Sequence, residues 1–192
     1  IQNALACKSS RAVISNGHSF TYEQLLTDSS NWSHELLNGL VDLHEERIAF
    51  TVSPSYEYVA VQWGIWRAGG VAVPLCVKHP IDSIRYTIED TQASVIVYAP
   101  EFEELLRPLM NQESIRFINI GSTEQFPTVE LPDVDVNRRA MILYTSGTTG
   151  KPKGVVTTHA NIETQVQTLV TAWKWQPTDH ILNVLPLHHV HG

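Results

Sequence analysis

Apolar residues follow two different spacings along the chain. Short, nearly continuous apolar runs are separated by longer stretches in which apolar residues recur every three or four positions, the spacing of one helix face. The runs typical of buried strands are 47–52, 71–75, 94–98, 115–120, 141–144 and 181–185. Helices are expected over 55–68, from Pro80 through Ile88, after Pro100, and from Thr158 to Trp173. This alternation predicts βαβ units with right-handed crossovers, and therefore an α/β fold with a mostly parallel sheet flanked by helices.

The first forty residues predict a hairpin followed by a long helix. Asn16-Gly17 separates two short runs and suits the positive φ angles of a tight turn. Thr21, with Gln24 three residues later, has the spacing of a capping box. Leucines then recur at helical spacing as far as Leu40, which predicts a helix of about five turns.

Prolines mark two later helix starts. Ser53 is expected to cap the helix over 55–68, with Pro54 at its first position. Pro100 is expected to begin a helix whose first turn holds the glutamates at 101, 103 and 104. The positive end of the helix dipole favours carboxylates there, so we interpret these acids as a solvated helix start rather than as catalytic groups.

Composition narrows the classes of function. The chain has 192 residues, of which 43% are hydrophobic and 17% charged, as in an ordinary globular domain. A net charge of −7 with only 13 Lys and Arg argues against a nucleic-acid partner, which would require a concentrated basic face. Two cysteines, Cys7 and Cys76, indicate a reducing compartment rather than a disulfide framework. No apolar run approaches the roughly 20 residues that cross a bilayer, so no transmembrane segment is expected.

A polar stretch follows the apolar run 141–143. Residues 144–154 read Tyr-Thr-Ser-Gly-Thr-Thr-Gly-Lys-Pro-Lys-Gly, a composition with which a loop cannot build a core. Glycines let the backbone turn its N–H groups inward, Ser and Thr hydroxyls add donors, and lysines add positive charge. The stretch therefore predicts a cradle for phosphate oxygens, which we interpret as a nucleotide triphosphate site.

This stretch does not match the commonest phosphate-binding or nucleophile motifs. In the P-loop pattern two glycines stand further apart than Gly147 and Gly150, and Lys151 would precede Ser or Thr rather than Pro152. The proline biases Lys151 away from helical backbone, so the loop is expected to join two extended segments. The Rossmann pattern is absent, and Ser146 lacks the flanking glycines of a hydrolase nucleophile. A flexible linker is the remaining alternative, although linkers do not usually carry Lys-Pro-Lys between apolar strands.

Three stretches together resemble the adenylate-forming superfamily, which comprises acyl-CoA synthetases, firefly-type luciferases and peptide-synthetase adenylation domains. Residues 144–154 resemble its phosphate-binding signature, and residues 66–75 look like its Ala-Gly-x-x-x-x-Pro-Leu element. Residues 185–192, Leu-Pro-Leu-His-His-Val-His-Gly, look like its next core motif, which lines the acyl pocket. The histidine-rich form is similar to that of malonyl-CoA synthetases of the mitochondrial acyl-CoA synthetase type. The resemblance covers essentially the whole chain.

The resemblance implies an ATP-dependent reaction in two steps. A small carboxylate, malonate or methylmalonate, attacks the α-phosphate of ATP to give acyl-AMP and pyrophosphate, and the thiol of coenzyme A then forms the acyl-CoA thioester. Mg²⁺ is expected to bridge the phosphate oxygens, and no protein ligand to a metal is assigned. The residues expected to bind the nucleotide phosphates are Thr145, Ser146, Gly147, Thr148, Thr149, Gly150, Lys151, Pro152 and Lys153.

His188, His189 and His191 are the candidates for binding the acyl carboxylate. Imidazoles can donate hydrogen bonds to a carboxylate that an apolar acyl pocket would reject. A metal site is an alternative, since His189 and His191 would share a face of an extended segment, but no Cys or carboxylate lies nearby in the sequence to complete the ligands. A purely structural role is a second alternative.

The resemblance also carries expectations about the whole protein. Residues 1–192 are expected to form the N-terminal portion of an AMP-binding domain, without its C-terminal remainder or the small C-terminal domain. The catalytic lysine is then expected beyond residue 192, so no catalytic residue is assigned, and the fragment alone is expected to be inactive. The expected compartment is the mitochondrial matrix, with the cytoplasm as the alternative.

Three other functions remain as alternatives. A medium-chain fatty acyl-CoA ligase would share the fold and the phosphate loop. A non-catalytic nucleotide-binding or interaction fragment would keep the loop without the chemistry. A P-loop phosphotransferase is disfavoured because Pro152, rather than Ser or Thr, follows Lys151.

Overall fold

The computed structural model describes residues 1–122, 130–145 and 151–189. In this part of the chain the main sheet has six strands, in the spatial order β6 (Arg116–Asn119), β5 (Val95–Tyr98), β3 (Arg47–Thr51), β4 (Val71–Pro74), β7 (Arg139–Thr145) and β8 (Lys153–Thr158). Neighbouring strands are parallel except for the last pair, β7 and β8, which is antiparallel. The predicted α/β class with a mostly parallel sheet is confirmed.

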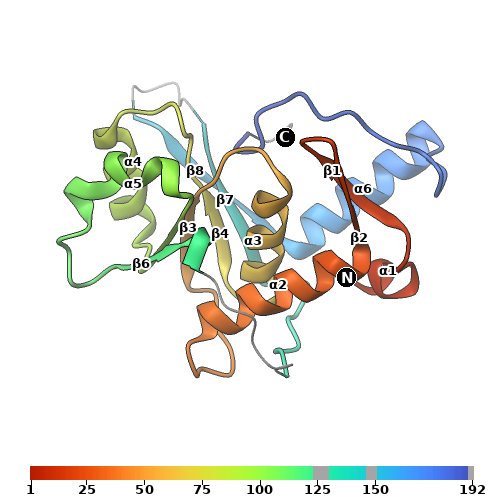
Figure 1. The fold of residues 1–192 in the computed structure, drawn as a ribbon, viewed down its shortest axis with the longest axis horizontal. Coiled ribbons are helices and arrows are strands. Elements are labelled where there is room, and N and C mark those ends of the chain that lie inside the picture. Colours follow the sequence, from red (N-terminus) through yellow and green to blue (C-terminus); the bar gives the residue numbers. More distant parts are fainter. Residues whose placement is uncertain (123–129, 146–150, 190–192) are drawn as a thin grey trace.

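Helices cover both faces of this sheet. The longer ones are α2 (Tyr22–Leu37), α3 (Tyr56–Arg67), α4 (Ile81–Thr91) and α6 (His159–Trp173), and the short ones are α1 (Gln2–Ala6) and α5 (Glu103–Leu106). Single 3-10 turns occupy Pro100–Phe102, Arg107–Leu109 and Ile120–Ser122. Helices α2 and α3 lie on one side of the sheet and α4 and α5 on the other (Figure 1). No helix in the described part of the chain is long and apolar enough to cross a membrane.

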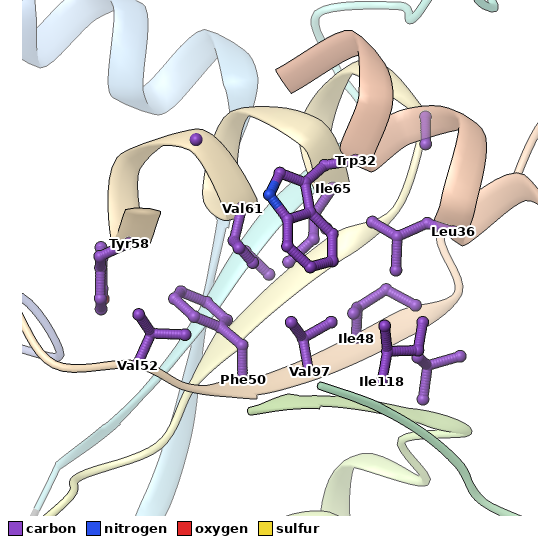
Figure 2. Close-up of a cluster of buried hydrophobic side chains, with 14 of the residues drawn as sticks. Trp32, Leu36, Ile48, Phe50, Val52, Tyr58, Val61, Ile65, Val97 and Ile118 are labelled. Atoms are coloured by element: carbon purple, nitrogen blue, oxygen red, sulfur yellow. The ribbon is translucent and has the colours of Figure 1, made fainter. Parts of the chain in front are cut away.

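Alternate residues of the central strands enter two separate cores. Ile48 and Phe50 of β3 pack in the cluster that contains the buried residues of α2 and α3, whereas Ala49 between them packs in the cluster of α4 and α5. Figure 2 shows the first cluster, where Trp32 of α2 and Ile65 of α3 lie over the strands. Because both faces are buried, these strands read as continuous apolar runs rather than as alternating ones.

A close approach of α2 and α3 organises the first core. A Cβ atom added at Gly64 of α3 would lie 2.3 Å from the Cβ of Trp32 on α2. The buried hydroxyl of Ser33 donates a 2.9 Å hydrogen bond to the Gly64 carbonyl across the same contact. Glycine at this position therefore lets the two helix backbones meet.

The N-terminal predictions are confirmed with one change of boundary. Strands β1 (Arg11–Ser15) and β2 (His18–Thr21) form an antiparallel hairpin, with Asn16 and Gly17 at φ angles of 51° and 79°. The side chains of Thr21 and Gln24 form both bonds of the capping box at the start of α2. The helix ends at Leu37 rather than near Leu40, because Asn38 adopts left-handed backbone.

The predicted N-cap of α3 is wrong by two residues. Ser55, not Ser53, accepts the backbone N–H of Tyr58, at 3.4 Å. The Ser53 hydroxyl instead donates to the Glu101 carboxylate from another element, at 3.0 Å. Ser53 therefore does not cap α3 as its position before proline predicted, because its hydroxyl bonds a carboxylate that is distant in the sequence.

The helix predicted after Pro100 is interrupted. It divides into a 3-10 turn, the four residues of α5, and a second 3-10 turn that contains Pro108. Proline has no N–H to donate to the preceding turn, so a regular α-helix cannot continue through Pro108.

The strand predicted over 181–185 does not form. Ile181, Leu182 and Val184 are 62%, 85% and 77% exposed, and no described strand pairs with them. A strand requires a neighbour to bond its backbone, and apolar character alone does not supply one.

Candidate functional site

The antiparallel pair β7 and β8 places the Gly-rich stretch. Their register ends with Thr145 opposite Lys153, so residues 146–152 connect the two strands. Strand β7 runs parallel to β4, and therefore its end lies at the same edge of the sheet as the carboxyl ends of β3 and β4. Ligands in open parallel sheets bind at this edge. The sequence prediction that the loop joins two extended segments, and that the helix begins only afterwards, is confirmed.

The structure describes both ends of this loop. Thr145 is exposed, and its hydroxyl lies 3.5 Å from the Lys153 carbonyl. Lys151 and Lys153 are exposed on either side of the half-buried Pro152. The other predicted phosphate-binding residues, Ser146, Gly147, Thr148, Thr149 and Gly150, lie outside the described residues.

Helix α4 contacts both ends of the loop, which the sequence reasoning did not foresee. The Tyr86 hydroxyl donates a 3.1 Å hydrogen bond to the Pro152 carbonyl, and the Lys151 ammonium lies 6.0 Å from the Tyr86 ring centroid. The Tyr144 hydroxyl donates to the Asp90 carboxylate. Burial raises the pKa of Tyr144, and the hydrogen bond to Asp90 raises it further, so the phenol remains protonated. No sequence motif signals these contacts between elements more than fifty residues apart.

The histidine-rich segment reaches the same edge of the sheet. The Leu187 carbonyl accepts a 2.9 Å hydrogen bond from the Tyr58 hydroxyl, which stands in the first turn of α3, just after β3. The segment that leads to the C-terminal label in Figure 1 lies near the start of α3. His188 and His189 have ring centroids 4.4 Å apart, and His191 lies outside the described residues.

The surroundings of His188 favour its neutral form. Burial lowers the pKa of His188, and repulsion from His189, His79 and Lys78 lowers it further. Lys78 and His79 belong to the segment that follows β4, the neighbour of β3 in the sheet. A neutral imidazole here retains one N–H donor for an acceptor oxygen.

The described residues do not test the metal alternative for His189 and His191, because His191 lies outside them. They include no group of three His, Cys, Asp or Glu side chains arranged to hold a metal ion. The described groups at this edge include hydroxyls, imidazoles and ammonium groups, together with the carboxylates of Asp90 and Glu101. The hydroxyls, imidazoles and ammonium groups can donate hydrogen bonds and neutralise the charge of an anion.

Comparison with known proteins identifies the family. Residues 2–192 match the family model described as AMP-binding enzyme. The chain belongs to the AMP-binding enzyme family. This match confirms the resemblance to adenylate-forming enzymes that the sequence motifs indicated. The match covers the chain almost from end to end.

Several relatives are malonate–CoA ligases by name. The chain is 42% identical over 200 residues to the mitochondrial malonate–CoA ligase ACSF3 of Homo sapiens, an alignment that covers 98% of this chain and 35% of that protein. It is 34% identical over 207 residues to the malonate–CoA ligase of Arabidopsis thaliana, with 94% and 34% covered. The chain thus spans about a third of the length of these relatives.

A solved structure agrees with the fold. The ATP-bound crystal structure of MatB from Rhodopseudomonas palustris superposes with a TM-score of 0.80 and 25% sequence identity. The match covers 92% of this chain and 37% of that one.

Proposed function

We propose that this chain carries the triphosphate-binding loop and one wall of the carboxylate pocket of an ATP-dependent malonate–CoA ligase. The supporting observation is the β7–β8 hairpin, which presents exposed lysines beside a Gly- and Thr-rich loop at the carboxyl edge of the sheet. The names of the relatives support malonate as the substrate, with methylmalonate as a related candidate.

The proposed reaction has two steps. A carboxylate oxygen attacks the α-phosphorus of ATP, the bond to the β-phosphate oxygen breaks, and acyl-AMP and pyrophosphate result. The sulfur of coenzyme A then attacks the acyl carbon and displaces AMP, which gives the thioester. Both steps develop or displace phosphate charge, so a site for them needs fixed positive groups and N–H or O–H donors.

Residues 145–153 supply such groups in this proposal. Backbone N–H groups and Thr and Ser hydroxyls bind the β- and γ-phosphate oxygens, while Lys151 and Lys153 neutralise charge as pyrophosphate leaves. Mg²⁺ favours phosphate oxygens and water over protein cages. Mg²⁺ is therefore proposed to enter with the nucleotide, bound to its phosphate oxygens.

The histidines are proposed to bind the carboxylate substrate. His188 keeps an N–H donor in its neutral form, and His189 and His191 stand in the same short segment. Donors in this position would favour a substrate with a second carboxylate over an apolar acyl chain.

The catalytic lysine is expected outside residues 1–192, and these residues alone are proposed not to complete the reaction. The mitochondrial matrix is the proposed compartment, because the animal relatives are named as mitochondrial.

Carboxylate-dependent exchange of labelled pyrophosphate into ATP tests this proposal. The assay uses the complete protein that contains residues 1–192 and compares malonate, methylmalonate and octanoate. Faster exchange with malonate than with octanoate is expected. Preference for octanoate would indicate a medium-chain ligase instead, and ATP binding without any carboxylate-dependent exchange would indicate a nucleotide-binding module.

A further inference from the structure

Two residues of α4 face the ends of the phosphate-binding loop from outside it. Tyr86 and Asp90 stand four positions apart, so they share one face of the helix. The opposite face of α4 buries Ile84 and Ile88 in the core. The helix is therefore fixed to the sheet on one side and free to contact the loop on the other.

Each residue contacts a different end of the loop. The Tyr86 hydroxyl donates to the Pro152 carbonyl at 3.1 Å, directly before β8 begins. Asp90 accepts from the hydroxyl of Tyr144, the residue before the last of β7. The rings of Tyr86 and Tyr144 also meet edge to face, with centroids 6.3 Å apart. These contacts join the two strand ends to one rigid helix.

Tyr86 also contacts Lys151, whose positive charge is proposed to bind phosphate. The Lys151 ammonium lies 6.0 Å from the centroid of the Tyr86 ring, within reach of a cation–π attraction. Lys151 stands beyond the last backbone pair of the ladder, Thr145 with Lys153, so the sheet itself does not restrain it. Restraint before binding reduces the conformational entropy that a ligand must overcome.

We propose that Tyr86 and Asp90 are positioning residues that hold both ends of the loop ready for the triphosphate of MgATP. This rests on the proposed function. Tyr86 acts through the Pro152 carbonyl and Lys151, and Asp90 acts through Tyr144. Neither touches the nucleotide, and neither takes part in the bond changes of the reaction.

Two kinds of substitution at Tyr86 separate its hydroxyl from its ring. Tyr86→Phe removes only the hydrogen bond to Pro152, and the dissociation constant for MgATP should rise about fivefold, the change expected from one neutral hydrogen bond. Tyr86→Leu also removes the aromatic face under Lys151 and should weaken binding further.

At position 90, Asn keeps an acceptor for Tyr144, so Asp90→Asn should bind MgATP more tightly than Asp90→Ala. Tyr22→Phe, on α2, is the matched control and should change nothing.

The measurements are calorimetric titration with MgATP, thermal melting, and hydrogen exchange of the backbone over 144–158 without nucleotide. Tyr86→Phe should exchange faster in this segment while its melting temperature stays near that of the unsubstituted protein. In the exchange assay of the complete protein, KM for ATP should rise while KM for the carboxylate stays unchanged.

Unchanged MgATP affinity and unchanged hydrogen exchange in both Tyr86 variants would overturn the inference while leaving the proposed function intact. If the unsubstituted protein bound no MgATP, the proposed function would fail. The hydrogen-exchange comparison would then still show whether α4 holds the loop.

Discussion

Lys151 and Lys153 carry the positive charge at the loop, and the residues around them differ in kind. Lys151 lies over the Tyr86 ring, whereas Lys153 begins β8 and pairs through its backbone with Thr145. The sequence alone predicted that these two lysines bind an anion, because positive charge next to glycine and threonine is typical of anion sites whatever the fold. The sequence did not predict the contact of Lys151 with the Tyr86 ring, because Tyr86 is 65 positions earlier in the chain.

Removing either lysine charge should weaken MgATP binding. Lys151→Gln and Lys153→Gln are each expected to raise the dissociation constant roughly tenfold or more, since a contact with a charged group contributes about 1.5–3 kcal/mol. Isothermal titration of the complete protein that contains residues 1–192 measures this. The exposed Lys8→Gln serves as control for the loss of one charge, and equal affinities in all three variants would contradict the prediction.

His159, the first residue of α6, predicts a pH dependence of stability. Burial lowers the pKa of His159 below its ordinary value of 6.5, and Arg138 lowers it further. Its Nε2 is buried and has no hydrogen-bond partner among the described residues, and the His159 and Trp66 ring centroids lie 6.0 Å apart with the rings nearly perpendicular. Because the folded-state pKa is lower than the unfolded one, the unfolded state takes up the proton first as the pH falls. The contribution of His159 is therefore complete above about pH 6.5 and is lost toward lower pH.

Urea unfolding at about pH 7.5 and about pH 5.5 measures this effect. The unsubstituted chain should lose more free energy of unfolding between the two values than His159→Gln does. The exposed His18→Gln should behave like the unsubstituted chain. A His159→Gln variant with the same loss as the unsubstituted chain would refute the assignment.

At the scale of elements, the period of apolar residues predicted five strands of the main sheet, β3 to β7, and each long helix, whereas β8 was expected only as an extended segment after the loop. Predictions from local sequence patterns were wrong where the outcome depended on a hydrogen-bond partner far away in the sequence. Ser53 bonds Glu101 instead of capping α3, and the run 181–185 has no described strand beside it. The helix after Pro100 failed for a local reason that the sequence did contain, namely Pro108.

The contact of α2 with α3 predicts that Gly64→Ala destabilises the chain. Alanine would ordinarily favour a helix interior by about 1 kcal/mol over glycine. Here the new Cβ would lie 2.3 Å from the Trp32 Cβ, and overpacking of this kind costs about 1–3 kcal/mol. The net change in the free energy of unfolding should be a loss, measured by urea unfolding. Gln62→Ala on the same helix should change it by less than about 0.5 kcal/mol, and a gain for Gly64→Ala would contradict the close contact.

At the scale of the whole molecule, the described residues divide into a well-packed part and an apolar surface. The two cores cover both faces of β3, β4 and β5. By contrast, no residue of α6 is fully buried, His159 being half-buried, although the sequence of α6 is amphipathic, and Trp173 is 62% exposed. Val155 and Val156 of β8 and Leu182 are exposed as well. Exposed apolar side chains such as these favour association with other apolar surfaces.

This surface predicts that the 192-residue chain binds a hydrophobic dye while folded. Trp173→Lys combined with Leu182→Lys should reduce the dye fluorescence and any self-association seen by light scattering. Ile14→Lys in β1 replaces another exposed apolar residue outside this surface and should change both signals less. Equal fluorescence for the two variants would show that the surface is covered in solution.

Taken by itself, the amino-acid sequence determined the features that depend on neighbouring residues: the α/β alternation, the capping box at Thr21, the Asn16-Gly17 turn, and the composition of residues 144–154 from which phosphate binding is proposed. Tertiary structure alone decided the strand order, the antiparallel partner of β7, and the contacts of Tyr86 and Asp90 with the loop. The reason is physical. Periodicity and capping arise within a few residues, whereas these other features depend on which distant groups the folded chain brings within hydrogen-bonding distance.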